Sequence, residues 1–292
     1  MADELEYSAN IETGREIENG RDTENGRRRF LRNAALAGLG LAAAPLLLTS
    51  PAEAGGLFAT VSPDDQKKIG DQAAAQVLKQ YPEVFDARAK HFTQIGQRLV
   101  RALPASDRSK WDFKFHVLDS KTVNAFALPG GNMFMFTGLY QLLSTDDALA
   151  GVTGHEMTHV RLQHWAQANA KEQERQAGIG LLLGLFHAGR TAQTIAGLAD
   201  TVIGKKYGRG EEDQADQGGL QNMVAAGYNP QGMIELFQAL EKVSGNGGMI
   251  GGDFLSDHPL TSDRIKHTKE RIAAMQNSRT FPPVTPLHYS KL

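Results

Sequence analysis

Two histidines and a glutamate stand close together near the middle of the chain, in the run His155-Glu156-Met-Thr-His159. Residues four apart lie about one turn apart on an α-helix, so His155 and His159 would project from the same face and could bind one metal ion together. Glu156 lies about 100° around the helix from His155, which suits a base beside a metal better than a ligand on it. The spacing therefore predicts a metal site with a carboxylate placed to take a proton from water. A helix with two surface histidines and a glutamate is the alternative, because so short a pattern also arises by chance.

The segment that must position these residues, 145–162, has the pattern of a helix. Ser144 or Thr145 can cap its start, and two aspartates follow, where the positive end of the helix dipole favours them. Apolar residues recur at roughly helical spacing, so we expect one face to be buried. They include Leu149, Val152, Met157 and Val160.

A second acidic segment, 211–216, reads Glu-Glu-Asp-Gln-Ala-Asp and begins another predicted helix. A catalytic zinc ion typically takes three protein ligands and leaves one position for water, and two histidines with one glutamate are an established set. Glu212 is therefore the candidate third ligand. Asp216, one turn further on, could accept the free ring N–H of a zinc-binding histidine and fix its tautomer. Taken alone, the segment is more simply explained as an acidic helix start that complements the dipole.

The stretch from 111 to 136 is expected to form strands. Residues 111–118 alternate apolar and polar, and His116 falls on the polar phase, where it is expected to be exposed rather than a ligand. Residues 123–136 have the pattern of a strand, a Pro-Gly-Gly turn and a second strand. A strand just ahead of the metal-binding helix could hold an extended peptide as an added strand. An ordinary buried hairpin is the alternative. The other predicted elements are helices that start at Pro63, cover about 86–103 and 166–175, start at Pro230, and end near 276.

Composition narrows the chemistry. The chain has 292 residues, 41% of them hydrophobic, and a net charge of −2, so it is expected to be globular and gives no sign of a nucleic-acid partner. It contains no cysteine. Disulfides, thiolate ligands, a cysteine nucleophile and a lipid-modified cysteine are therefore excluded, and a transition-metal site must use His, Asp and Glu.

The first 54 residues have the pattern of an export signal behind a polar lead. Residues 1–26 are acidic and are expected to be disordered. The basic run 27–32, Arg-Arg-Arg-Phe-Leu-Arg, precedes an uncharged stretch and then Ala-Glu-Ala at 52–54, which is the order of a secretory signal. The paired arginines resemble a twin-arginine signal, whose passengers cross the membrane folded.

We therefore expect residues 1–54 to be an extension plus signal peptide and residues 55–292 to be a single extracytoplasmic domain. An uncleaved N-terminal anchor is the alternative, although the apolar run is shorter than the ~20 residues that span a bilayer. Translation could also start later than Met1.

A run of small and apolar residues lies at 178–204. It is far too short and too interrupted to span a bilayer, and we expect a helical hairpin that covers the active-site cleft. A peripheral membrane contact is the alternative. His187, inside this segment, is not expected to be a ligand.

Four separated segments together resemble peptidase family M48. They are Asn-Ala-Phe-Ala-Leu-Pro-Gly-Gly at 124–131, His-Glu-Met-Thr-His at 155–159, Glu-Asp-Gln-Ala-Asp at 212–216, and His-Pro-Leu-Thr-Ser-Asp-Arg-Ile at 258–265. The resemblance covers roughly residues 60–275 and departs from the family's multi-span members, which have transmembrane helices. It implies an α+β, mainly helical, zincin-like fold with a small β-sheet beside the histidine-bearing helix.

The resemblance also implies a role for particular residues. His155, His159 and Glu212 match the zinc ligands, Glu156 the catalytic glutamate, Asp216 the supporting aspartate, Asn124 and Ala125 the strand that holds substrate, and His258 and Arg264 a pair near the metal. Either member of the last pair could stabilise the oxyanion of the transition state. His258, carried by the glycine-rich loop 244–253, could instead occupy the open zinc position and keep an enzyme latent, or simply cap a turn before Pro259.

The function implied by the resemblance is a zinc-dependent endopeptidase with one Zn²⁺ per chain. Its expected substrates are polypeptides in the bacterial cell envelope, unfolded or misassembled, in protein quality control. The alternative is a periplasmic chaperone or scaffold with the same fold and little or no proteolysis.

Overall fold

The structure, a computed structural model, describes residues 61–176, 206–245 and 252–287. The expected signal segment at 1–54, the expected hairpin at 178–204 with His187, and residues 246–251 of the glycine-rich loop lie outside the described residues. All of the described residues belong to the unit Ala54–Leu292.

A four-stranded mixed sheet has the strand order β1-β2-β4-β3. Its strands are β1 (Glu83–Val84), β2 (Lys114–Leu118), β3 (Ala125–Ala127) and β4 (Asn132–Phe136). Strand β1 is antiparallel to β2, β2 is parallel to β4, and β4 is antiparallel to β3. The last three strands fall within the segments predicted from the sequence, whereas the two-residue strand β1 was not expected.

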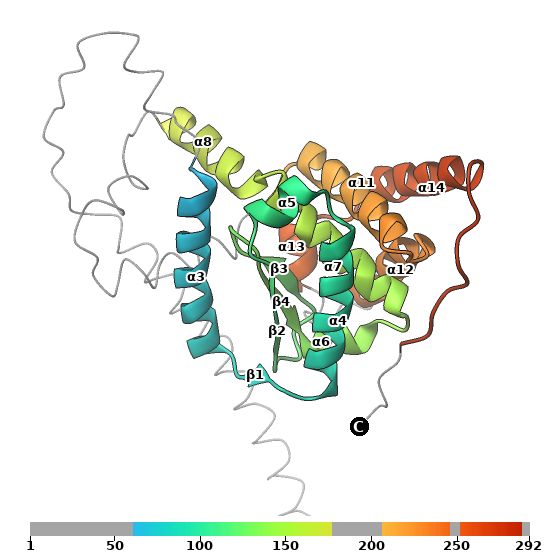
Figure 1. Ribbon diagram of the computed structural model, residues 1–292, viewed down its shortest axis with the longest axis horizontal. Helices are drawn as coiled ribbons and strands as arrows, with labels where there is room; N and C mark the ends of the chain where they lie inside the picture. Colours follow the sequence, from blue (N-terminus) through green and yellow to red (C-terminus); the bar gives the residue numbers. More distant parts are fainter. Residues whose placement is uncertain (1–60, 177–205, 246–251, 288–292) are drawn as a thin grey trace, which may run out of the picture. The chain divides into compact units, whose positions relative to one another are not determined.

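Helices cover both faces of this sheet, so strand β4 is buried along its whole length. Successive side chains of a strand point to opposite faces. Phe134 and Phe136 pack in the cluster that contains Ile69, Ala73 and Val77 of α3 (Pro63–Gln80). The alternate residues of β4, two methionines, pack in a second cluster with α4 (Ala87–Ala102) and α7 (Asp146–Arg161). Figure 1 shows α3 on one side of the sheet and α4 and α7 on the other.

Helix α7, which carries the His155–His159 motif, is the central element. Thr145 caps it by accepting the backbone N–H of Ala148 at 3.0 Å. Every residue of α7 from Asp147 to Val160 is buried. The helix contacts β3, α4, α11 (Arg209–Ala225) and α12 (Gln231–Gly245). Its motif therefore faces other elements on all sides rather than solvent.

The remaining helices are short or peripheral. They are α5 (Ala105–Lys110), α6 (Thr137–Leu142), α8 (His164–Gln176), α13 (Gly252–Asp257) and α14 (Ser262–Gln276). Helix α13 begins within the segment 244–253 that was expected to be a loop, and it leads directly into His258.

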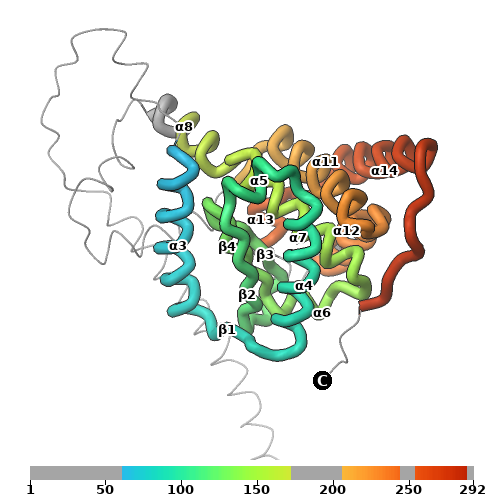
Figure 2. The backbone as a smooth tube through the Cα atoms, viewed as in Figure 1, coloured from blue at the N-terminus to red at the C-terminus, as the bar shows by residue number. Residues whose placement is uncertain are grey.

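The segment after α14 returns to the start of α7 (Figure 2). The N–H of Asp146 donates to the carbonyl of Thr285 at 2.9 Å, and the N–H of Leu287 donates to the carbonyl of Ser144 at 3.0 Å. The carboxylate of Asp147 accepts the N–H of Thr285 at 2.7 Å. The C-terminal segment is thus tied to the N-terminal end of the central helix.

The α+β, mainly helical fold with a small sheet beside the motif helix is confirmed. Among the helices that the structure describes, none combines the length and the apolar character needed to cross a membrane.

Candidate metal centre

The helices that carry the predicted ligands, α7 and α11, approach each other closely where each has a glycine. A Cβ added at Gly219 would lie 3.0 Å from the backbone nitrogen of His155. One added at Gly154 would lie 3.2 Å from the carbonyl oxygen of Gly219. Side chains larger than hydrogen would separate the two backbones at this point. The glycines therefore allow the acidic first half of α11 to lie against the histidines of α7.

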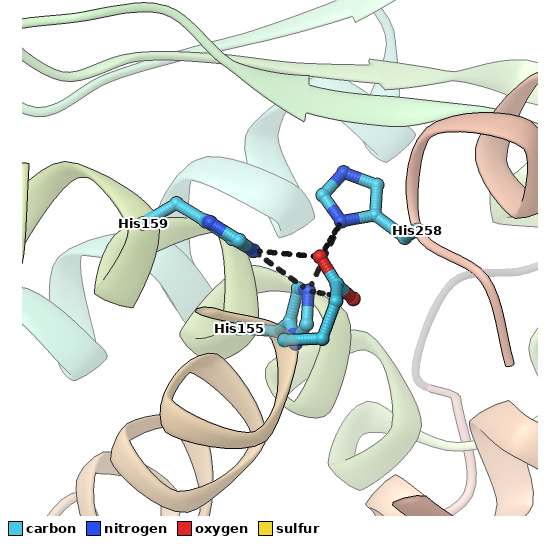
Figure 3. A group of neighbouring side chains, drawn as sticks. His155, His159 and His258 are labelled. Atoms are coloured by element: carbon cyan, nitrogen blue, oxygen red, sulfur yellow. Dashed lines mark hydrogen bonds and ion pairs between the residues drawn. The ribbon is translucent and has the colours of Figure 1, made fainter. Parts of the chain in front are cut away.

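Four buried side chains converge at this contact, and they are His155, His159, Glu212 and His258. One donor atom of each lies within 4.8 Å of the others. The Nε2 atoms of His155 and His159 are 3.1 Å apart. Oxygens of Glu212 lie 3.6 Å from the first and 3.4 Å from the second. Figure 3 shows the three imidazoles converging, two from α7 and the third from the segment after α13.

His258 closes the fourth side of this cluster. Its Nδ1 lies 3.4 Å from Nε2 of His155 and 2.8 Å from Oε1 of Glu212. Its position depends on the packing of α13, because Phe254 stacks on the imidazole at a centroid separation of 4.9 Å. The structure thus brings a histidine from a distant segment into the same group as the predicted ligands.

An aspartate and an arginine contact the cluster from behind. Nδ1 of His155 donates to Asp216 at 2.9 Å, which leaves Nε2 with a lone pair that faces the other three residues. Arg264 donates two hydrogen bonds of 2.7 Å to Asp216, and its Nη1 lies 2.7 Å from Oε2 of Glu212. Burial alone would raise the pKa of Asp216, but the hydrogen bonds from Arg264 and His155 outweigh it and lower this pKa. All three guanidinium nitrogens therefore contact carboxylates of this site.

The glutamate of the motif lies between the sheet and the cluster. Oε2 of Glu156 accepts the backbone N–H of Ala127 in β3 at 3.0 Å. Its Oε1 is buried, lies 3.5 Å from Nε2 of His258, and has no hydrogen-bond partner among the described residues. Burial raises the pKa of Glu156 above its ordinary value. One carboxylate oxygen is thus held by the sheet, and the other is available to take a proton.

The electrostatics of the pocket favour a cation. Burial alone would lower the pKa of His258, but the carboxylates of Glu156 and Glu212 raise it to about 9. Burial would likewise raise the pKa of Glu212, but the charge of His258 and hydrogen bonds from His159 and His258 hold it far below its ordinary value. Two buried carboxylates therefore stabilise positive charge at the centre of the cluster.

Strand β3 is the last strand of the sheet and borders this site. The carbonyl of Asn124, just before β3, accepts the N–H of Phe136 at 3.0 Å, so its backbone faces β4. In an antiparallel pair, successive residues direct their backbone groups alternately toward and away from the partner strand. Ala125 and Ala127 consequently direct theirs to the outer edge. The N–H of Ala127 is the one that Glu156 accepts.

Two aromatic residues join the site that sequence reasoning missed. Nδ1 of His164 lies 2.9 Å from Nδ1 of His159. Tyr207, just before α11, has its ring centroid 4.1 Å from that of His159 and 5.5 Å from that of His258. Burial raises the pKa of Tyr207, so its phenol stays protonated. Local spacing indicates neither contact, although a further histidine five residues after the motif was a signal that could have been noted.

These groups fit a metal ion. Burial lowers the pKa of His159 and His164, which keeps both imidazoles neutral. Nε2 of His155 and the carboxylate of Glu212 present lone pairs to the same point, and such groups repel each other unless a cation lies between them. Oε1 of Glu156 is buried beside them without a hydrogen bond from the part of the chain that the structure describes. This buried His/Glu cluster could therefore bind a metal ion.

A small sheet beside a helix with two histidines, a glutamate from a second helix and a base next to the cluster are together the architecture of zincin-like metallopeptidases. The family model for peptidase family M48 matches residues 86–272, which is more than half of the chain. The chain belongs to peptidase family M48, as the sequence motifs predicted.

Several relatives are similar to this chain. A beta-barrel assembly-enhancing protease of Yersinia pestis is 29% identical over 228 residues, which cover 75% of this chain and 46% of the relative. Mitochondrial metalloendopeptidase OMA1 of Saccharomyces cerevisiae is 32% identical over 166 residues, 55% of this chain and 47% of the relative. Metalloprotease YcaL of Escherichia coli is 27% identical over 220 residues, 74% of this chain and 83% of the relative. The chain spans about half the length of the first two.

Proposed function

We propose that this protein is a zinc-dependent endopeptidase, with His155, His159 and Glu212 as the zinc ligands and Glu156 as the general base. The spacing of the ligand atoms carries the proposal. In a tetrahedral zinc site with bonds of about 2.0–2.1 Å, neighbouring ligand atoms lie roughly 3.3–3.4 Å apart. The three pairs formed by the imidazoles and the glutamate measure 3.1, 3.4 and 3.6 Å.

The residues of the chain divide the chemistry between them. Zinc, when bound, supplies Lewis-acid polarisation of the scissile carbonyl and an acidified water. Glu156 takes the proton of the attacking water on its free oxygen and passes it to the leaving amine nitrogen. Its other oxygen stays on the N–H of Ala127, which fixes the direction of the carboxylate. Asp216 sets the tautomer of His155, and Arg264 offsets the charge of the carboxylates behind the cluster.

An extended polypeptide is the substrate that this geometry favours. Strand β3 lies last in the sheet, next to Glu156, so a substrate strand added at its outer edge would pass the cluster. The outward backbone groups of Ala125 would pair with it. Asn124 acts one step back, by fixing the register of β3 on β4 through its carbonyl. No side-chain pocket is needed for such binding, which suits unfolded chains of varied sequence.

The position of His258 supports a latent resting state. Its Nδ1 lies 3.4 Å from Nε2 of His155, which is the separation expected of a fourth tetrahedral ligand. A histidine in that position takes the place that water needs. Arg264 is less suited to stabilise an oxyanion, because its nitrogens are engaged with Asp216 and Glu212.

The cellular setting extends the same proposal. The relatives include proteases named for β-barrel assembly enhancement and a mitochondrial metalloendopeptidase. The segment 27–54 has the order of an export signal. We place the protein in the bacterial cell envelope, where it cleaves unfolded or misassembled proteins in quality control.

Hydrolysis of an unfolded protein by the full chain tests this function. Zinc-loaded protein should cleave unfolded casein, a chelator should stop cleavage, and added zinc should restore it. Glu156→Gln should keep zinc bound and lower the turnover rate by on the order of 10²–10⁴-fold, the usual contribution of a general base. Glu241→Gln makes the same charge change at an exposed position of α12 and should cleave normally.

A scaffold or chaperone would give another pattern. It would suppress aggregation of unfolded casein without cutting it, and Glu156→Gln would leave that activity unchanged. Cleavage by Glu156→Gln at the rate of the parent protein would show that this glutamate is not the base.

A further inference from the structure

His164 contacts His159 although their spacing along a helix would separate them. Residues five apart on a continuous α-helix point about 140° away from each other. The two Nδ1 atoms are nevertheless 2.9 Å apart, and His164 is fully buried. The chain must therefore change direction between them.

Gln163 makes this change of direction. It lies between α7 and α8 with φ at 58°, in the left-handed region that residues other than glycine rarely adopt. Its side chain is held from α3, because Nε2 of Gln66 donates to its Oε1 at 2.8 Å. A strained residue that neighbouring structure holds in place is typical of functional sites. Here the turn aims the imidazole of His164 back at α7.

The hydrogen bonds determine where the protons of the two imidazoles lie. Oε1 of Gln214, an acceptor, is 3.1 Å from Nε2 of His164, so this nitrogen carries the proton. In a neutral imidazole the other nitrogen, Nδ1 of His164, then accepts. The proton between the two rings belongs to Nδ1 of His159, and Nε2 of His159 is left with a lone pair that faces Nε2 of His155.

We propose that His164 and Gln214 form a positioning relay for His159, as Asp216 does for His155. The inference rests on the proposed metal centre and adds to it a residue that orients a ligand without touching the metal. The two ligand histidines then differ in support, since Asp216 is an anion whereas His164 is neutral. Partners of this kind typically change metal affinity by 10–100-fold.

Zinc affinity, measured by competition with a chromophoric chelator, tests the relay without any need for catalysis. His164→Phe keeps the ring and removes the acceptor, and it should weaken zinc binding by about 10–100-fold. His164→Gln offers a carbonyl oxygen to Nδ1 of His159 and should recover most of the affinity. Cobalt-substituted His164→Phe should show an altered visible absorption spectrum, because the imidazole of His159 is no longer held.

Two further variants separate the relay from a general effect of losing a buried histidine. His91→Phe removes another buried histidine, which hydrogen-bonds Tyr140 at 2.7 Å beyond the start of α7, and should leave zinc affinity unchanged. Gln214→Leu alters an exposed residue that is unlikely to be needed for folding in any other way, so it decides the question if His164→Phe does not fold. It should weaken zinc binding by less than His164→Phe.

The outcomes distinguish the two levels of the proposal. If the parent protein binds no zinc, the metal centre itself is wrong, and the relay with it. If the parent binds zinc while His164→Phe and Gln214→Leu match its affinity and cobalt spectrum, the relay is wrong and the metal centre stands.

Discussion

Single side chains at this site have either one charge partner or several, and the difference assigns their roles. Arg264 contacts two carboxylates, so it balances charge. Glu156 has one oxygen bound to the sheet and one without a hydrogen bond among the described residues, so it can exchange a proton. His258 lies between these extremes, because its Nδ1 faces Glu212 and its Nε2 faces Glu156. It is the residue for which geometry permits two functions.

The variant His258→Ala separates these two functions by the direction of its effect. If His258 holds the fourth ligand position in most molecules, its removal should raise the rate of casein cleavage, by about tenfold where about a tenth of the molecules are otherwise competent. An oxyanion donor would give the opposite result, a fall of about 10²–10³-fold. Cleavage rate at equal zinc content is the measurement. A rate below that of the parent protein would rule out the latent state.

At the scale of elements, the site depends on the contact between α7 and α11. Glu212 and Asp216 reach the histidines because Gly154 and Gly219 let the two helices approach. Strand β3 meets α7 on the side of Glu156, and α13 delivers His258. Helix packing is close to crystal density, so a methyl group added at such a contact must move a backbone or a neighbour.

Gly219→Ala tests this contact. The added Cβ would lie 3.0 Å from the backbone nitrogen of His155 and 3.1 Å from Cε of Met233, so the helices must separate slightly. We expect a loss of about 1–3 kcal/mol in the free energy of unfolding, as for other overpacked positions, together with weaker zinc binding. Chemical denaturation and zinc competition measure the two effects.

A matched change on the same helix provides the control. A Cβ at Gly210 meets nothing within 4 Å, so Gly210→Ala should be neutral or stabilise by up to about 1 kcal/mol. Equal behaviour of the two variants would mean that the close approach of the helices does not position Glu212.

At the scale of the whole molecule, the cluster joins segments that are far apart in the sequence. His155 and Asp216 are 61 residues apart, and His155 and His258 are 103 apart. The carboxylates of Glu156, Glu212 and Asp216 are all buried. A divalent ion would offset their charge and link α7, α11 and the segment after α13. Metal binding should therefore stabilise the fold as well as supply chemistry.

Removal of the metal should lower the thermal unfolding midpoint. A ligand present at about 1,000 times its dissociation constant stabilises a protein by roughly 4 kcal/mol, which corresponds to about 8–16 °C for a domain of this size. Calorimetry with and without a chelator measures the shift, and added zinc should reverse it. Glu212→Ala, which lacks the third ligand, should show little of it. An unchanged midpoint in the parent protein would mean that the folded cluster holds no metal.

Local periodicity was enough to predict much of this protein. The four-residue spacing of His155 and His159 places them on one helical face whatever surrounds the helix, because it follows from 3.6 residues per turn. The same reasoning located β2, β3 and β4, the cap of α7 and the shared face of Glu212 and Asp216. The motifs together predicted the family.

Tertiary structure decided which of these faces meet. Nothing in the spacing of His258 or Arg264 says that one reaches the ligand cluster and the other its carboxylates, because both depend on the packing of α13 and α14 against α11. The contact between His159 and His164 required the left-handed turn at Gln163, and a regular helix would have kept the two rings apart. Helical and strand spacing follows from the repeat of one backbone, whereas contacts between segments depend on how side chains of distant elements fill the same space.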